Sequence, residues 1–382
     1  MKDIFSWIIH PSDEMKNSLI IIIAVATAAI LVAAGAIVML NKDNGNNDNN
    51  DNNDNGQATV IDGLGRPVTI KSTDRIASTS ATVTEIICGI GGYSKLAGVT
   101  VDTNPYKVKE YIMGIPDDNY PKIILDGLAS KKLVNMGGMY NIAAESILIS
   151  KPDLVIMGGY FNSENTITQL GALGIPVVIC KDDNSLENIY FNIRLIGKVI
   201  GKESEAETLV GQMEFAISKV VNWTKSLNAT PKSVAVFMMY GSSYGTYACG
   251  TEYLMGTPIL TMLGCTNAFS GISGKYQIVS TESIVAVNPE IVIDITPGSA
   301  ADLSSIKTSP VIKNITAAKN DRIYGAFDAC NTAVSLTTQG FVNAVAIMAM
   351  FMYEDHLNFE IDHYMGDDYP DYLKKFWTQI NS

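Results

Sequence analysis

Aromatic side chains in polar loops are the residues of this sequence that most suggest chemistry. The clearest case is the segment 241–247, GSSYGTY, in which tyrosines stand among glycine and serine, so we expect a binding loop rather than a core strand. A tyrosine ring offers a flat apolar face and a hydroxyl, which suits a macrocycle or an aromatic chelate. For each tyrosine, simple half-buried packing stays the alternative. The candidate ligand-binding residues are Tyr106, Tyr140, Tyr160, Phe161, Tyr240, Tyr244, Tyr247, Lys275 and Tyr276.

Arginine and histidine, the usual partners of anions and metal ions, are scarce. The sequence holds only four arginines, all in segments that we expect to be framework, and only three histidines. A carboxylate-rich complex such as ferric citrate would need arginine forks, and a bare metal ion would lack nitrogen ligands. We therefore expect a neutral or cationic ligand with an apolar face, no metal site and no cofactor. Haem held by a tyrosine stays open.

Other function classes fit the sequence poorly. No glycine-rich phosphate loop is present and no pair of acids is placed by the sequence, so we expect neither catalytic residues nor an enzyme. Asp and Glu total 39 against 27 Lys and Arg, and a net charge of −12 argues against nucleic acid, whose binding needs a basic surface. The five cysteines are scattered, so we expect buried free thiols, with a Cys249–Cys265 disulfide as the alternative.

The first 57 residues have the composition of a membrane anchor and a linker. Ser18–Leu40 is an uncharged apolar run long enough to cross a bilayer of about 30 Å as a helix, and no cysteine for lipid attachment follows it. We expect residues 1–17 to be a short cytoplasmic N-terminus, 18–40 an uncleaved transmembrane anchor and 41–57 a disordered Asn/Asp-rich tether. Asp51, Asn53, Asn55, Gly56 and Asp62 also have the spacing of a calcium loop, although such a match arises easily in this composition.

From residue 58 the sequence alternates short apolar runs with amphipathic stretches, which is typical of parallel α/β layers. Residues 60–70 predict an opening hairpin. The segment 145–156, ESILISKPDLVI, recurs 137 residues later as 282–293, ESIVAVNPEIVI. Each copy predicts a short helix with an acid in its first turn, a proline that ends it and a buried strand. A repeat at domain-sized spacing indicates two similar lobes.

A long helix is predicted between the two copies. Apolar residues in Ser204–Leu227 fall on one helical stripe, and such a helix would be about 35 Å long, enough to bridge two lobes. The predicted fold class is α/β, with two Rossmann-like lobes joined by one long helix and preceded by a transmembrane helix. We expect an N-terminal lobe at 58–202, the bridging helix at 203–228 and a C-terminal lobe at 229–382.

The ordered set of segments resembles the ferric-siderophore and vitamin B12 binding proteins of ABC importers. VIDGLGRPVTI, TEIICGIGGYSKLAGV and ESILISKPDLVIM match the family's first lobe, and YACGTEYLMGTPILTMLGCTNAF, STESIVAVNPEIVI and AAKNDRIYG match its second. The resemblance implies a monomeric, extracytoplasmic receptor that carries a ferric siderophore, haem or corrinoid to a permease and its ATPase. It also implies that Glu145 and Glu282, one on each lobe, meet arginines of the permease. The uncleaved anchor departs from the family pattern.

A surface-anchored glycan-binding or adhesive protein is the rival interpretation. Sequons at Asn222, Asn228 and Asn314 would fit any exported protein. Adhesive proteins more often use β-sandwich modules, so the repeat and the long helix favour the transport interpretation.

Overall fold

The computed structural model describes residues 58–100, 120–138, 142–159, 163–182, 184–239, 245–296, 309–326, 330 and 338–382. Residues 57–382 form one compact unit, and residues 1–56 form a separate unit that lies wholly outside the described residues. The predicted span Ser18–Leu40 and the first four positions of the predicted calcium loop belong to that separate unit. Within the described ranges, no helix has both the length and the apolar character needed to cross a membrane.

The first lobe is built on a parallel sheet of five strands in the order β5-β4-β3-β6-β7. Its strands are short apolar runs, and β3, β4, β6 and β7 are buried along their whole length, as expected for a parallel sheet covered on both faces. The strands are β3 (Ile76–Ser78), β4 (Leu96–Val99), β5 (Val134–Asn135), β6 (Leu154–Met157) and β7 (Val177–Ile179).

Serines begin three helices of this lobe. Ser80, Ser163 and Ser185 each accept a hydrogen bond from the backbone N–H three residues later, which satisfies one of the free donors of a helix N-terminus. The helices are α3 (Ala81–Gly89), η1 (Tyr93–Lys95), α4 (Tyr120–Ala129), α5 (Ala144–Leu148), α6 (Glu164–Ala172) and α7 (Leu186–Ile200). The predicted opening hairpin is confirmed as the antiparallel pair β1 (Ala58–Ile61) and β2 (Pro67–Ile70).

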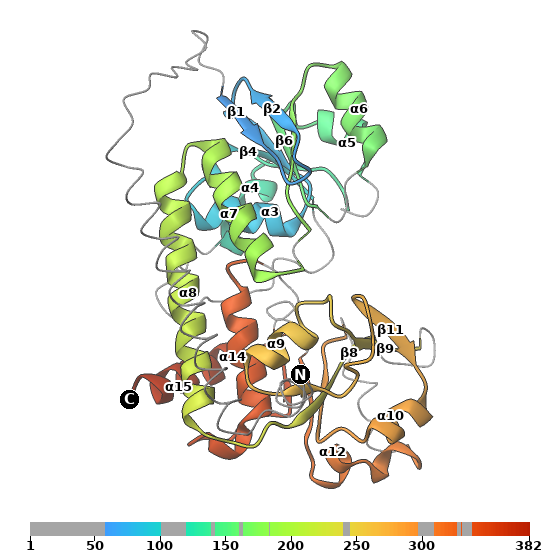
Figure 1. Ribbon diagram of the computed structural model, residues 1–382. Helices are drawn as coiled ribbons and strands as arrows, with labels where there is room; N and C mark the ends of the chain where they lie inside the picture. Colours follow the sequence, from blue (N-terminus) through green and yellow to red (C-terminus); the bar gives the residue numbers. More distant parts are fainter. Residues whose placement is uncertain are drawn as a thin grey trace, which may run out of the picture. The chain divides into compact units, whose positions relative to one another are not determined.

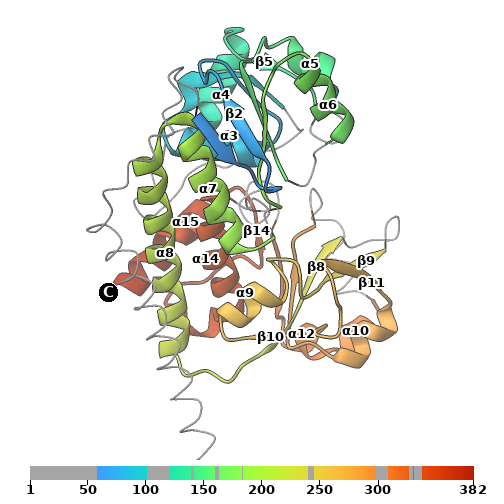
Figure 2. The same ribbon diagram turned by 45° about the horizontal axis from the view of Figure 1, so that its top comes forward.

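The second lobe has a mixed sheet in the order β11-β9-β8-β12-β13-β14, with β10 also paired to β8. β8, β12, β13 and β14 run parallel, whereas β9 is antiparallel to β8 and β11 is antiparallel to β9. Figure 2 shows β9 and β11 together at the edge of this sheet. The strands are β8 (Ser233–Met239), β9 (Thr246–Cys249), β10 (Thr266–Asn267), β11 (Tyr276–Val279), β12 (Ile291–Asp294), β13 (Ile323–Ala326) and β14 (Tyr364–Met365).

The core of the second lobe contains a helix buried on every face. All twelve residues of α14 are buried, as the apolar composition of Phe341–Tyr353 predicts. The helices of this lobe are α9 (Thr257–Met262), α10 (Thr281–Val287), η3 (Ile312–Asn314), α12 (Thr316–Lys319), α14 (Phe341–Met352), η4 (Glu354–His356) and α15 (Tyr369–Asn381). Cys249 and Cys265 are buried thiols that form no disulfide, and the other three cysteines are buried as well.

The sequence repeat is confirmed as a repeated helix–strand unit. α5 leads into β6 and α10 leads into β12, and each strand lies between two parallel neighbours of its sheet. The equivalence extends to backbone conformation, because Lys151 and Asn288, the residues before the two prolines, both have positive φ, at 49° and 43°. Asparagine adopts this region readily, whereas a lysine does so rarely, so the unit imposes the conformation at Lys151.

The predicted long helix is α8 (Glu203–Ser226), with 24 residues and a length of about 36 Å. Its buried stripe includes Leu209, Met213, Ala216 and Val220, as the periodicity predicts. α8 packs against α7 of the first lobe and against α14 and α15 of the second (Figure 1). Near its C-terminal end, Trp223 contacts Tyr353 and Phe376 edge to face, with ring centroids 6.0 and 5.1 Å away.

Candidate functional site

An ion pair joins the two lobes directly. Lys275, just before β11, donates a hydrogen bond of 2.8 Å from Nζ to Oδ2 of Asp182, which follows β7 of the first lobe. A second contact lies deeper, where Nε2 of the buried Gln339 donates to the backbone oxygen of Glu85 in α3, also at 2.8 Å. Lys275 was a candidate from the sequence, whereas Asp182 and Gln339 were not.

Three tyrosines form a cluster next to Lys275. The ring of Tyr276 lies edge to face with Tyr247, at 5.8 Å between centroids, and with Tyr253, at 6.3 Å. The rings are not fully buried, and Tyr276 is exposed. The structure therefore brings together the candidates Tyr247, Lys275 and Tyr276 and adds Tyr253, whose place in the segment TEYLMG gave no signal of a site. Such a cluster offers apolar ring faces and hydroxyl groups to a ligand.

The expectation that Tyr247 and Tyr276 lie in loops was wrong. Tyr247 is the second residue of β9, and Tyr276 is the first residue of β11. Tyrosine favours strands, and here β9 pairs antiparallel with both β8 and β11. The remaining candidates lie outside the described residues, and they are Tyr106, Tyr140, Tyr160, Phe161, Tyr240 and Tyr244.

The segment GSSYG at 241–245 also has the spacing Gly-x-Ser-x-Gly, which marks the nucleophile of many hydrolases. That motif acts at a sharp turn between a strand and a following helix. Here the strand β8 is followed by the antiparallel strand β9 instead, so the structural context of such a nucleophile is not met.

The backbone that carries Asp182 is closely confined. A Cβ atom on Gly63 would lie 2.4 Å from the backbone carbon of Cys180, and one on Gly159 would lie 2.4 Å from the backbone nitrogen of Asp182. The residue before Asp182 is also held by a side chain. Oδ1 of Asn192 accepts from Lys181 N at 2.7 Å, and Nδ2 of Asn192 donates to Lys181 O at 3.0 Å. Asp182 therefore approaches the second lobe from a segment with little freedom to move.

Asp62, the last position of the predicted calcium loop, is engaged by protein groups. Its buried carboxylate accepts from Arg66 Nε at 3.0 Å and Nη2 at 2.6 Å, and from the backbone of Leu64, Arg66 and Ile179. Burial acts to raise the pKa of Asp62, but the hydrogen bonds from Arg66 and Leu64 outweigh it and lower that pKa. A cation here would have to displace a guanidinium, which contradicts a role for Asp62 as a calcium ligand. The described residues contain no group of three or more side chains suited to a metal ion.

Glu145 and Glu282 occupy equivalent positions in the repeated unit, each in the first turn of its helix. Both side chains are exposed. Hydrogen bonds from its own backbone N–H and from the Ser280 hydroxyl lower the pKa of Glu282, so this residue carries a negative charge at neutral pH. Each lobe therefore has an exposed carboxylate in the first turn of the helix of its repeated helix–strand unit.

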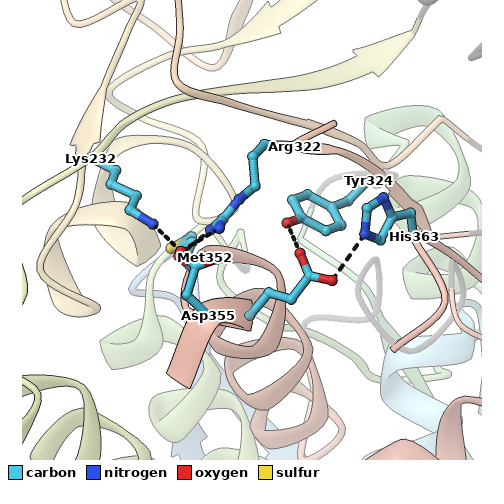
Figure 3. A network of polar contacts seen from close by, with 7 residues as sticks. Lys232, Arg322, Tyr324, Met352, Asp355 and His363 are labelled. Atoms are coloured by element: carbon cyan, nitrogen blue, oxygen red, sulfur yellow. Dashed lines mark hydrogen bonds and ion pairs between the residues drawn. The ribbon is translucent and has the colours of Figure 1, made fainter. Parts of the chain in front are cut away.

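A polar cavity of about 260 Å³ lies in the second lobe, where β8, β12 and β13 begin. Figure 3 shows its ion pairs: Asp355 accepts from Lys232 at 2.9 Å and from Arg322 at 2.5 Å. Hydrogen bonding from Lys232, followed by that from Arg322, lowers the pKa of Asp355 despite partial burial. Glu354 accepts a hydrogen bond from Tyr324 and pairs with His363, and Figure 3 labels both of these partners. These charges neutralise one another, so the network supports the framework of the lobe.

Comparisons with known proteins agree on one family. A family model described as "Periplasmic binding protein" matches residues 76–328. An uncharacterized ABC transporter substrate-binding lipoprotein of Bacillus subtilis (strain 168) is 28% identical over 269 residues, covering 70% of this chain and 77% of the relative. A vitamin B12-binding protein of Pectobacterium carotovorum is 25% identical over 179 residues, or 47% of this chain and 62% of the relative.

Solved structures show the same fold. The periplasmic heme-binding protein RhuT from Roseiflexus sp. RS-1, in its apo form, superposes with a TM-score of 0.58 at 22% identity, covering 74% of this chain and 99% of the other. At this level of identity the likeness shows the fold alone, which is the α/β fold of periplasmic binding proteins.

Proposed function

Because the chain belongs to the periplasmic binding protein family, we propose that it is a membrane-anchored extracytoplasmic receptor for an ABC importer. It delivers an iron complex, either a siderophore or haem, or a corrinoid. The observation that carries this proposal is the repeated helix–strand unit, which presents one exposed glutamate on each lobe. A relative named as an ABC transporter substrate-binding lipoprotein supports the same role.

The tyrosine cluster supports a large ligand with an apolar face. Tyr247, Tyr253 and Tyr276 pack edge to face next to Lys275, which pairs with Asp182 of the first lobe. In this proposal the other sequence candidates, Tyr106, Tyr140, Tyr160, Phe161, Tyr240 and Tyr244, complete the ligand site. Similarity to a relative named as a vitamin B12-binding protein favours a ligand of this size and kind.

The ligand class is tested by titrating the purified full-length protein in detergent. Cyanocobalamin, a ferric hydroxamate and haemin are added separately, and intrinsic fluorescence reports binding. We expect at least one of the three to bind tightly. Binding of free zinc, manganese or an amino acid, with none of the three bound, would refute the proposed ligand class and leave the fold assignment intact.

Docking through Glu145 and Glu282 is tested by charge reversal. Glu145→Arg and Glu282→Arg should leave ligand affinity nearly unchanged, because neither residue belongs to the tyrosine cluster. Uptake should fall by about tenfold or more in the double variant, since an attraction at the permease becomes a repulsion. Glu203→Arg is a matched control, because Glu203 is also an exposed acid in the first turn of a helix. Normal uptake by the double variant would eliminate the docking role.

The anchor and the domain boundaries are also part of the proposal. Residues 18–40 stay in the mature protein as a single membrane span, 41–57 form the tether, and the lobes at 58–202 and 229–382 are joined by the helix at 203–228. The receptor acts as a monomer. Mass spectrometry of the native membrane fraction should detect peptides from before Asn41. A mature protein that starts near Asn41 would show that the apolar run is a cleaved signal.

A further inference from the structure

We propose that each lobe docks on the importer through a carboxylate together with an exposed aliphatic side chain on the same helix face. The pairs are Glu145 with Ile149 in the first lobe and Glu282 with Val285 in the second. This inference rests on the proposed function, since it assigns the partner as the permease of an ABC importer. It adds an apolar component to a contact that charge alone would make weak.

The helical geometry places each pair on one face. Ile149 follows Glu145 by four residues and has α-helical backbone angles at the end of α5, and Val285 follows Glu282 by three residues inside α10. Residues three or four apart in a helix are neighbours on its surface. On the opposite side, Ile147 and Ile284 are buried and fix the rotation of each helix on its sheet. The glutamate and the aliphatic residue are therefore presented together.

Both aliphatic residues lie at the surface, and other exposed apolar residues lie near their helices. Ile149 is 67% exposed and Val285 is 36% exposed. The elements that pack against the two helices add to the apolar surface, because exposed Leu173 directly follows α6, which contacts α5, and exposed Val311 directly precedes η3, which contacts α10. Four of the eleven exposed large apolar residues among the described ones thus lie on or beside the two repeated units. Apolar patches next to charges are typical of protein–protein contacts.

The chemistry of the pairs identifies what the partner must present. A carboxylate on a chain of net charge −12 calls for a cation, and the aliphatic neighbour calls for an apolar surface beside that cation. Exposed ion pairs contribute little, because water and salt screen them. An aliphatic group that excludes water around the pair makes the contact both tighter and less dependent on salt. The permease therefore carries, on each side, a basic residue flanked by apolar ones.

The test uses the full-length protein and its importer in nanodiscs, loaded with whichever of cyanocobalamin, ferric hydroxamate and haemin binds most tightly. Stimulated ATPase activity is the readout. Ile149→Ser combined with Val285→Ser should raise the concentration for half-maximal stimulation by about tenfold or more, while ligand affinity stays unchanged. Ile149→Leu should retain the wild-type value. Leu64→Ser is a matched control, because Leu64 is 56% exposed but lies in the turn between β1 and β2.

Salt dependence separates the two components of the contact. Replacing the aliphatic residues should steepen the dependence of stimulation on salt concentration, because water and salt then reach the ion pairs, whereas Glu145→Gln with Glu282→Gln should flatten it. If the glutamate variants impair stimulation and the serine variants do not, the inference is overturned and the proposed function stands. If the wild-type protein fails to stimulate the importer at all, the proposed function itself is overturned.

Discussion

Replacing Asp182 by asparagine tests how the contact between the lobes shapes ligand choice. Asp182 is the first-lobe partner of Lys275, at 2.8 Å, and the two side chains are 39% and 26% exposed. Asparagine keeps the shape of the side chain and removes its charge. Lys275 then keeps its charge and loses the charged contact with Asp182, beside Tyr276 in the tyrosine cluster. A ligand with carboxylates no longer competes with Asp182 for that cation.

The size of the effect follows from the geometry. At 2.8 Å the Coulomb energy of the pair is about 1.5 kcal/mol in a medium like water. Fixing two partly exposed side chains costs part of this energy, so such pairs contribute about 0.5–1 kcal/mol in practice. Asp182→Asn should therefore tighten haemin binding by a factor of about two to five, since haemin carries two carboxylates. Cyanocobalamin, which has no carboxylate, should bind within about twofold of its wild-type affinity.

Fluorescence titration of the full-length protein at low and high salt measures both affinities. The gain for haemin should shrink at high salt, because the pair is partly exposed. Adding Lys275→Met to Asp182→Asn should abolish the gain, since the cation that the ligand uses is gone. Equal changes for haemin and cyanocobalamin, or a gain that survives Lys275→Met, would show that Lys275 does not meet the ligand.

Three further predictions concern the frame and the aromatic site. Trp223→Ala should lower the free energy of unfolding by about 3 kcal/mol, seen as a lower denaturant midpoint, because the half-buried ring loses its contacts with Tyr353 and Phe376. Asp62→Asn should flatten the dependence of stability on pH in acid. Because the pKa of Asp62 is lowered in the folded state, its stabilising effect is complete above the ordinary value of 3.8 and is lost as pH falls through the folded-state pKa. The same loss of stability in acid for the variant and the wild type would contradict this. Alanine at Tyr240, Tyr244 and Tyr247 in turn should include at least one loss of ligand affinity of about 10²-fold, by titration.

Periodicity and repetition made much of the frame predictable. The repeated segments 145–156 and 282–293 hold the units α5–β6 and α10–β12. The apolar stripe of Ser204–Leu227 is α8, which begins and ends one residue earlier. These elements are set by local apolar patterns, which a sequence displays directly. The antiparallel strands β9 and β11 were not predicted, because their tyrosines suggested binding loops and β11, at the sheet edge, has no buried residue.

The contacts between lobes could not be predicted for a different reason. Asp182 meets Lys275 across 93 residues, and Gln339 meets Glu85 across 254. Neither pair has a local motif, because each depends on how two separately folded sheets come together. Ile149 and Val285 were likewise missed, since an aliphatic residue in a short helix is expected to be buried unless the rotation of that helix is known.

The hairpin at the start of the described chain determines how the fold responds to mechanical force. A pull on the chain before Ala58 enters the protein through β1, whose first residue pairs with the last residue of β2. The pairs from Ala58–Ile70 to Ile61–Pro67 would therefore open one after another, as in a zipper. Opening then reaches the charged cluster of Asp62 and Arg66, where Gly63 N also donates to Ile179 O at 2.6 Å. At that point the force reaches β7. A small extension would therefore open the four residue pairs of β1 and β2 before it strains the sheet that leads to Asp182.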